Sequence, residues 1–178
     1  MDARDKIRVT EAAERIARPG RTPAQVRALW HRWMDAGIIP PAVETEWGAG
    51  GLAFIFPESA AAIAAVLFDL YDAGAVTARH QLASMWRYFA EPQHDGGEPL
   101  ITHVLAEVEH GSPCFLVLTY WRHQTTGEIA PTCGVRFHEE LDRPFEAPSQ
   151  FHEPVSKCVT PLHLLLARFV SDLPAQVN

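Results

Sequence analysis

Long apolar runs, closely spaced cysteines and an excess of positive charge are all missing from this 178-residue sequence. No run is long and uncharged enough to span a membrane, and residues 1–10 do not resemble a signal peptide, so a cytoplasmic protein is expected. Three cysteines without a CxxC pair favour reduced thiols over a disulfide framework: Cys114, Cys133 and Cys158. Zinc ligands typically include pairs about two to four residues apart, and these cysteines form no such pair, so no metal site is expected. No cofactor is expected either.

The net charge of −7 argues against a general nucleic-acid coat, but the charge is unevenly distributed. Residues 1–40 contain eight Lys and Arg against five Asp and Glu, residues 41–90 two against five, and residues 91–178 five against twelve. A positive segment on an otherwise acidic chain is typical of a protein in which one face meets phosphate and the rest stays soluble.

Residues 22–36 show the clearest helix pattern in the chain. Thr22 is expected to cap the helix, Pro23 suits its first turn, and Gln25 can reach back to the Thr22 amide. Gly37 is expected to end the helix in a left-handed conformation. The apolar residues recur at three- and four-residue steps and should be buried: Val26, Leu29, Trp30, Trp33 and Met34. The opposite face is small and basic: Ala24, Arg27, Ala28, His31 and Arg32.

The segments around this helix predict a helix-turn-helix with a wing. A short strand or arm at residues 7–9 precedes a helix at 10–17, which Thr10 is expected to cap, and a turn at 18–21 contains Pro and Gly. Two short helices joined in this way are the helix-turn-helix pattern. Residues 43–56 then predict a two-stranded hairpin with a glycine tip beside the second helix.

Two further helices complete the expected N-terminal domain of residues 1–90. The first, residues 59–72, is rich in alanine and large apolar residues and should be the central buried helix. The second, residues 77–90, should be capped by Thr77. Residues 91–99 are polar and contain Gly and Pro, which indicates a linker.

Residues 100–178 are expected to form a small α+β domain, so the whole chain is assigned to the α+β class. The segments with strand character are residues 100–108, 114–121 and 129–137. The middle segment is apolar on both faces and should be the central strand. Residues 139–160 resemble a loop because they contain several prolines, and residues 160–172 should be a final helix.

Three short motifs occur in order between residues 9 and 74, which is less than half of the chain. They are VRAL at residues 26–29, GIIP at residues 37–40, and the hairpin strand at residues 51–56 followed by Pro57-Glu58. In this order they resemble the MerR-type winged helix-turn-helix DNA-binding domain. The resemblance implies a mostly helical winged helix with a two-stranded wing, a second helix in the major groove, a wing on the phosphate backbone, and dimers formed through a later element.

The combined expectation is a sequence-specific, duplex DNA-binding transcriptional regulator that acts as a homodimer. Arg27, His31 and Arg32 would contact bases or backbone, and Arg21 would contact phosphate. The full set of expected DNA-binding residues is Arg21, Thr22, Gln25, Arg27, Ala28, His31, Arg32 and Gly50. The C-terminal domain would dimerise, or bind a protein partner or a small ligand.

Other chemistry has weaker support in the sequence. Trp30 and Trp33 could stack on bases, but they share the apolar face of their helix, which favours core packing. His138 beside Glu139 could support acid–base catalysis, yet such charged runs in a proline-rich loop are usually solvated. The sequence contains no nucleophile elbow, P-loop or HExxH motif, so no enzyme is expected.

The alternative function is a winged-helix protein-interaction module or adaptor that does not bind DNA. Glu44 and Glu46 in the first wing strand would repel phosphate, and Ala53 stands where the MerR-type wing carries an arginine. The net charge of −7 favours the same interpretation. Salt dependence separates the two functions, because affinity that rests on phosphate contacts falls steeply as salt is added.

Overall fold

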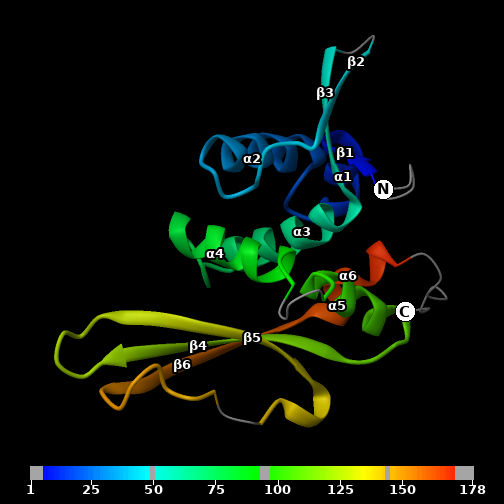
Figure 1. The fold of residues 1–178 in the computed structure, drawn as a ribbon. Helices are drawn as coiled ribbons and strands as arrows, with labels where there is room; N and C mark the ends of the chain where they lie inside the picture. Colours follow the sequence, from blue (N-terminus) through cyan, green and yellow to red (C-terminus); the bar gives the residue numbers. More distant parts are fainter. Residues whose placement is uncertain (1–5, 49–50, 93–96, 143–144, 171–178) are drawn as a thin grey trace. The chain divides into compact units, whose positions relative to one another are not determined.

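The chain divides into two units, one extending to Leu105 and the other beginning at Ala106. The computed structural model describes residues 6–48, 51–92, 97–142 and 145–170. Each unit combines helices with a three-stranded antiparallel sheet, which confirms the expected α+β class (Figure 1). The division falls within helix α5 (Leu100–Glu109).

The N-terminal unit begins with a strand that leads directly into two helices, followed by a hairpin and two more helices. Its elements are β1 (Lys6–Arg8), α1 (Val9–Ile16), α2 (Pro23–Asp35), β2 (Glu44–Gly48), β3 (Gly51–Pro57), α3 (Glu58–Asp72) and α4 (Arg79–Ala90). The sheet order is β1-β3-β2, so β3 is the central strand. The expected hairpin is therefore confirmed, and it extends well beyond α1 and α2 in Figure 1.

Helix α2 begins and ends as its sequence predicts. The Gln25 amide donates to Thr22 Oγ1 over 3.3 Å, and the Thr22 amide donates to Gln25 Oε1 over 2.8 Å. Gly37 adopts φ +67° immediately beyond the helix. The expected apolar face is buried, apart from the half-buried Met34: Val26, Leu29, Trp30 and Trp33.

Helix α3 is the centre of the N-terminal core, as expected. Every residue from 60 to 68 is buried, and five of these nine are alanines, which let neighbouring elements approach closely. The aromatic side chains of α2 pack on both α3 and β3. The ring centroids of Trp33 and Phe68 are 4.6 Å apart, and those of Trp30 and Phe56 are 5.2 Å apart.

Thr10 and Thr77 are not helix caps, contrary to expectation. Helix α1 begins at Val9, whose side chain is buried, so the strand passes directly into the helix and Thr10 already lies inside the first turn. Helix α4 begins at Arg79 after an extended Ala78, and neither helix has a side-chain capping hydrogen bond. The residues at the N-cap positions are instead Arg8 and Ala78, both with extended backbone.

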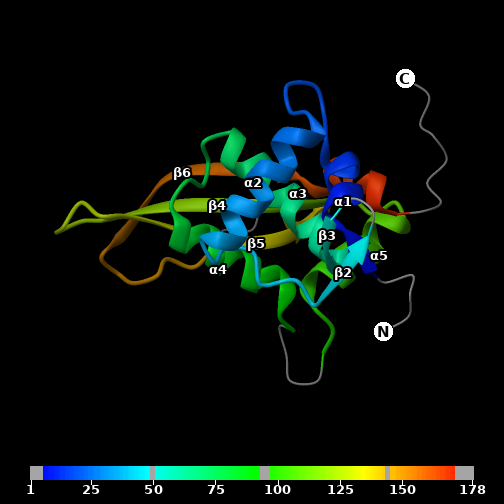
Figure 2. The same ribbon diagram turned by 90° about the horizontal axis from the view of Figure 1, so that it is seen from above.

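The C-terminal unit is built around one long strand. Its elements after α5 are β4 (Cys114–His123), β5 (Ile129–Phe137), the 3₁₀ turn η2 (His138–Glu140), β6 (His152–Pro161), α6 (Leu162–Leu166) and the 3₁₀ turn η3 (Ala167–Phe169). Strand β4 lies between β5 and β6, and Figure 2 shows the three running side by side. Residues on both faces of β4 are buried, which confirms its predicted central place: Leu116, Val117, Leu118 and Trp121.

The strand expected at residues 100–108 is wrong, because this segment is helix α5. Its β-branched residues suggest a strand, but Ile101, Val104 and Val108 recur at helical steps, and all three are buried. The final helix is also shorter than expected. Helix α6 ends at Leu166 and continues only as the η3 turn within the described residues.

The loop expected at residues 139–160 extends only to residue 151, because strand β6 begins at His152. Proline lacks a backbone donor and is tolerated only at edges and bulges of a sheet. Strand β6 pairs with β4 on one side only, and its register shifts at Trp121, which faces Pro154. The edge position and the bulge together explain how a proline-containing segment becomes a strand.

The capping box of α2 should contribute measurably to stability. Thr22→Ala leaves the Gln25 amide without its acceptor and should lower the free energy of unfolding by about 1 kcal/mol. Thr10→Ala is the matched control, since Thr10 is exposed within α1, and its effect should stay within about 0.5 kcal/mol. Urea denaturation followed by far-ultraviolet circular dichroism measures both. Equal losses in the two variants would contradict this assignment.

Candidate functional site

The outward face of α2 is small, basic and exposed. The residues that the sequence assigns to this face are all exposed: Ala24, Arg27, Ala28, His31 and Arg32. Arg27 and His31 are four residues apart, so they lie one turn apart on the same side of the helix. Thr22 and Gln25 are also exposed, but in the capping box the side chain of each accepts a hydrogen bond from the backbone amide of the other.

Carboxylates balance most of the other cations at the start of this unit. The ion pairs are Lys6–Glu44, Arg8–Glu46, Arg15–Glu11, Arg15–Glu58, Arg18–Asp69, Arg18–Asp72 and Arg21–Asp72. Within the described part of the chain, Arg27 and Arg32 form no such pair. Arg27 and Arg32 are therefore the unpaired cations among described residues 6–40, and they share α2 with one unpaired carboxylate, Asp35 at its end.

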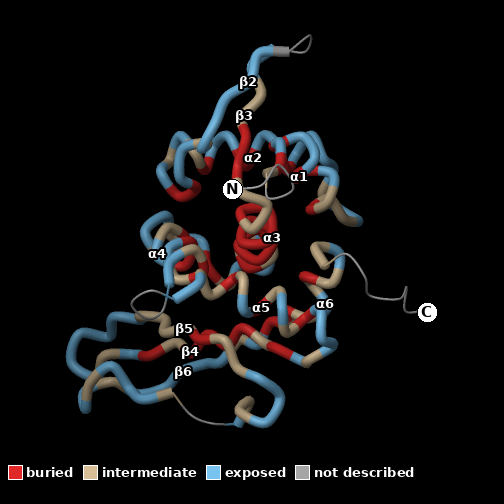
Figure 3. Tube along the Cα trace, turned by 45° about the vertical axis from the view of Figure 1, so that its right-hand side comes forward, coloured by how far each residue is buried: buried red, intermediate tan, exposed pale blue. Residues whose placement is uncertain are grey.

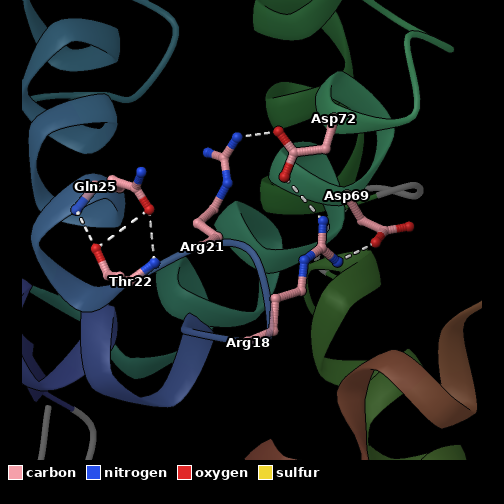
Figure 4. Close-up of polar contacts among 6 residues, drawn as sticks. All are labelled: Arg18, Arg21, Thr22, Gln25, Asp69 and Asp72. Carbon is pink, nitrogen blue, oxygen red and sulfur yellow. Dashed lines mark hydrogen bonds and ion pairs between the residues drawn. The ribbon is translucent and has the colours of Figure 1, made fainter.

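The turn before α2 is tied to the end of α3 by two arginines (Figure 4). Arg18 donates to Asp69 and, over 2.9 Å, to Asp72, while Arg21 also donates to Asp72. Burial acts to lower the pKa of Arg18, but the hydrogen bonds and charges of the two aspartates raise it above its ordinary value. Arg21, which the sequence assigns to phosphate, is thus already paired within the protein.

Arg79 is a cation near α2 that sequence reasoning missed. Its Nη2 lies 3.6 Å from the position that a Cβ at Gly37 would occupy, just beyond the end of α2. Arg79 is exposed and, among the described residues, has no ion-pair partner. Proximity between residues so far apart along the chain leaves no local signal in the sequence.

One face of the β2–β3 hairpin carries two ion pairs that reach across β3. Lys6 and Arg8 of β1 donate to Glu44 and Glu46 of β2, the second pair over 2.8 Å. Ala53 occupies the same face of β3 opposite Glu46, where its small side chain leaves room for the crossing. The two glutamates that the sequence sets against phosphate binding are therefore neutralised by neighbouring cations.

The other face of the hairpin leads from α2 to an exposed apolar tip. Phe54 contacts His31 of α2, with ring centroids 5.6 Å apart. Further along, Trp47 lies directly opposite Leu52, and their residues are 83% and 42% exposed. Figure 3 shows this outer half of the hairpin as exposed. Gly50, which the sequence assigns to DNA binding, lies outside the described residues.

Trp47 is the functional candidate that sequence reasoning did not single out. The other four tryptophans are at most 5% exposed: Trp30, Trp33, Trp86 and Trp121. The burial of Trp30 and Trp33 confirms that they pack in the core, and it leaves neither ring exposed for stacking on bases. One feature of the sequence could have identified Trp47. It directly precedes the glycine-rich tip of the predicted hairpin, and a side chain near such a tip has few protein neighbours to bury it.

The C-terminal unit has a cavity of about 390 Å³ on its sheet. Its lining includes Thr119, Trp121, Asp142, Phe145 and Lys157. The Phe145 ring lies against Gly134, where any Cβ would come within 2.7 Å of it. The volume suits a small ligand, and the small-ligand role of this domain stays a prediction.

Histidine, cysteine and acidic side chains do not converge on a metal-like cluster within the described ranges. Cys114 is fully buried, which confirms the expectation for its strand. Burial, reinforced by the negative charge of Glu107, raises the pKa of the Cys114 thiol to about 11. The acidic run near His138 is mostly exposed, as expected for a solvated segment.

No protein-family model, curated protein or solved structure matches this chain. Within the described segments, no helix has the length and apolar character needed to cross a bilayer.

The raised pKa predicts that Cys114 is nearly inert toward thiol reagents. At pH 8, a thiol with a pKa of about 11 is only about one part in a thousand thiolate, which is the reactive form. Iodoacetamide should therefore modify the half-buried Cys158 well before Cys114 in the native protein, as read by peptide mass spectrometry. Unfolding in urea should make the two rates similar. Equal native rates would show that Cys114 is not shielded as described.

Proposed function

We propose that the N-terminal unit is a winged-helix module and that the protein is a sequence-specific, duplex DNA-binding transcriptional regulator. The observation that carries the proposal is the distribution of ion pairs. Carboxylates compensate the cations of β1, α1 and the following turn, whereas Arg27 and Arg32 project uncompensated from α2. Uncompensated cations on a rigid helix are what a phosphate backbone attracts.

In this proposal α2 enters the major groove. Ala24 and Ala28 are small and exposed, so the helix backbone can approach base edges closely. Arg27 and His31 then lie one turn apart, and an arginine can pair with O6 and N7 of guanine. Arg32 and Arg79 supply backbone contacts. Arg21 stays paired with Asp72, so it fixes the turn before α2 instead of contacting phosphate.

The order of the elements supports the winged-helix assignment. A strand precedes α1 and α2, the hairpin follows α2, and β1 closes the sheet beside the hairpin. The β2–β3 hairpin corresponds to the wing of the MerR-type domain that the sequence resembles. Its glutamates are paired with Lys6 and Arg8, which removes the main electrostatic objection to placing it near phosphate.

Dimerisation is assigned to the C-terminal unit. Strands β5 and β6 each pair with β4 on one side only, which leaves two strand edges, and Ile129, Phe137 and Val159 are exposed along them. Such edges can pair with a second copy. A two-fold dimer would present two copies of α2 and would require a two-fold DNA site.

The proposal predicts that Arg27 sets both affinity and base preference. Duplexes with a randomised centre of about 30 bp, long enough for two half-sites, are selected on the purified protein and sequenced. Arg27→Ala should weaken binding to the enriched duplex by about 5- to 150-fold, which corresponds to about 1–3 kcal/mol for a guanine contact. Fluorescence anisotropy measures the affinity.

Arg87→Ala is the matched control, because Arg87 is an exposed arginine on α4 and its guanidinium contacts Ser84. Its affinity should equal that of the wild type. Wild-type affinity should also fall steeply between about 50 and 200 mM salt. Enrichment of no duplex, or an affinity insensitive to salt, would reject DNA binding and favour the protein-interaction alternative.

A further inference from the structure

The tip of the β2–β3 hairpin combines high exposure with apolar character. Trp47 is 83% exposed, and Leu52 stands directly opposite it on the neighbouring strand. Directly opposed residues of an antiparallel pair project from the same face, so the indole and the leucine side chain lie side by side. A single exposed apolar residue is common on protein surfaces, so the functional argument for Trp47 rests on what lies beside it on the same surface.

This tip cannot hold phosphate by charge. Between residues 44 and 57 the chain contains no lysine or arginine, and its acidic residues in the two strands are Glu44 and Glu46. Both are already paired, with Lys6 and Arg8, on the face opposite to the indole. What Trp47 and Leu52 offer to a partner is therefore apolar surface.

The apolar tip is continuous with the basic face of α2. Phe54 lies on the same hairpin face as Leu52, two residues or about 7 Å along β3. Phe54 in turn contacts His31, which lies between Arg27 and Arg32 on the exposed side of α2. One surface thus runs from uncompensated cations through an aromatic contact to the exposed indole, and a molecule bound at α2 meets the tip next.

We infer that Trp47 and Leu52 form an apolar wedge that enters the minor groove beside the site of α2 and unstacks a base step, bending the duplex. The inference rests on the proposed DNA-binding function. Apolar side chains that enter the minor groove part the base pairs and kink the helix. A flat indole supported by a leucine has the shape and the apolar surface for this insertion.

The fluorescence of Trp47 can be used to test whether this side chain is buried when DNA binds. Among its five tryptophans only Trp47 is exposed, so acrylamide quenching of the intrinsic fluorescence reports on this side chain. Addition of the duplex enriched by selection should abolish the acrylamide-sensitive part of the emission. The quenching of the complex should then match that of the free Trp47→Phe protein, whose four remaining indoles are buried.

Bending is measured as energy transfer between dyes at the two ends of the same duplex. Wild-type protein should raise the transfer, Trp47→Ala should lose most of this rise while keeping salt-dependent binding, and Trp47→Phe should restore it. Val43→Ala is the matched control, because Val43 is a 49% exposed apolar residue adjoining β2, and it should bend DNA as the wild type does. Circular dichroism verifies that each variant is folded.

The outcomes separate the wedge from the proposed function. If the duplex binds but Trp47 stays fully quenchable, or Trp47→Ala bends it normally, the wedge is wrong and DNA binding stands. If the wild type binds no duplex, both proposals fail. Loss of acrylamide quenching with rising protein concentration, in the absence of DNA, would assign the tip to a second copy of the chain and also overturn the wedge.

Discussion

The packing of Trp30 and Trp33 is the interaction on which the N-terminal unit depends. Trp30 contacts Phe56 of β3, Trp33 contacts Phe68 of α3, and both indoles come from one face of α2. Aromatic pairs of this kind contribute about 0.5–1.5 kcal/mol beyond the burial of their area. The Trp30 Nε1–H is buried without a hydrogen-bond partner among the described residues, which costs about 1–3 kcal/mol. The Trp30 ring is nevertheless buried in this position, so its packing must contribute more to stability than the missing hydrogen bond costs.

The ion pairs divide the cations at the start of the chain into two groups. One group joins β1 to β2 and the turn before α2 to α3, and its charge is balanced inside the unit. The other group, on α2, keeps its charge available to solvent. Charge counted along the sequence therefore overstates the positive surface of the first forty residues and conceals where that surface lies. The paired carboxylates also keep the hairpin from presenting a negative face toward whatever approaches α2.

The sequence could predict α2, the hairpin and the buried α3, because each carries a strong local signal: a capping box at Thr22, glycines at the hairpin tip, and an alanine-rich apolar run. It could also identify the exposed face of α2. It failed where the deciding contact is distant along the chain. The partners of Arg18 and Arg21 are about fifty residues away, and β6 becomes a strand only by pairing with β4. For α5, the β-branched residues suggested a strand, whereas the helical spacing of the apolar residues gave the correct prediction. The exposure of Trp47 likewise depends on how far the hairpin extends.

The two sides of α2 share no residues. The side chains that hold the helix in place face β3 and α3, and those that face solvent touch the core little, apart from the contact between His31 and Phe54. Mutations at Ala24, Ala28 or Arg32 can therefore accumulate in a lineage without loss of folding. Duplicated copies of such a protein could diverge in what they recognise while keeping one scaffold, with His31 as the outward position least free to change.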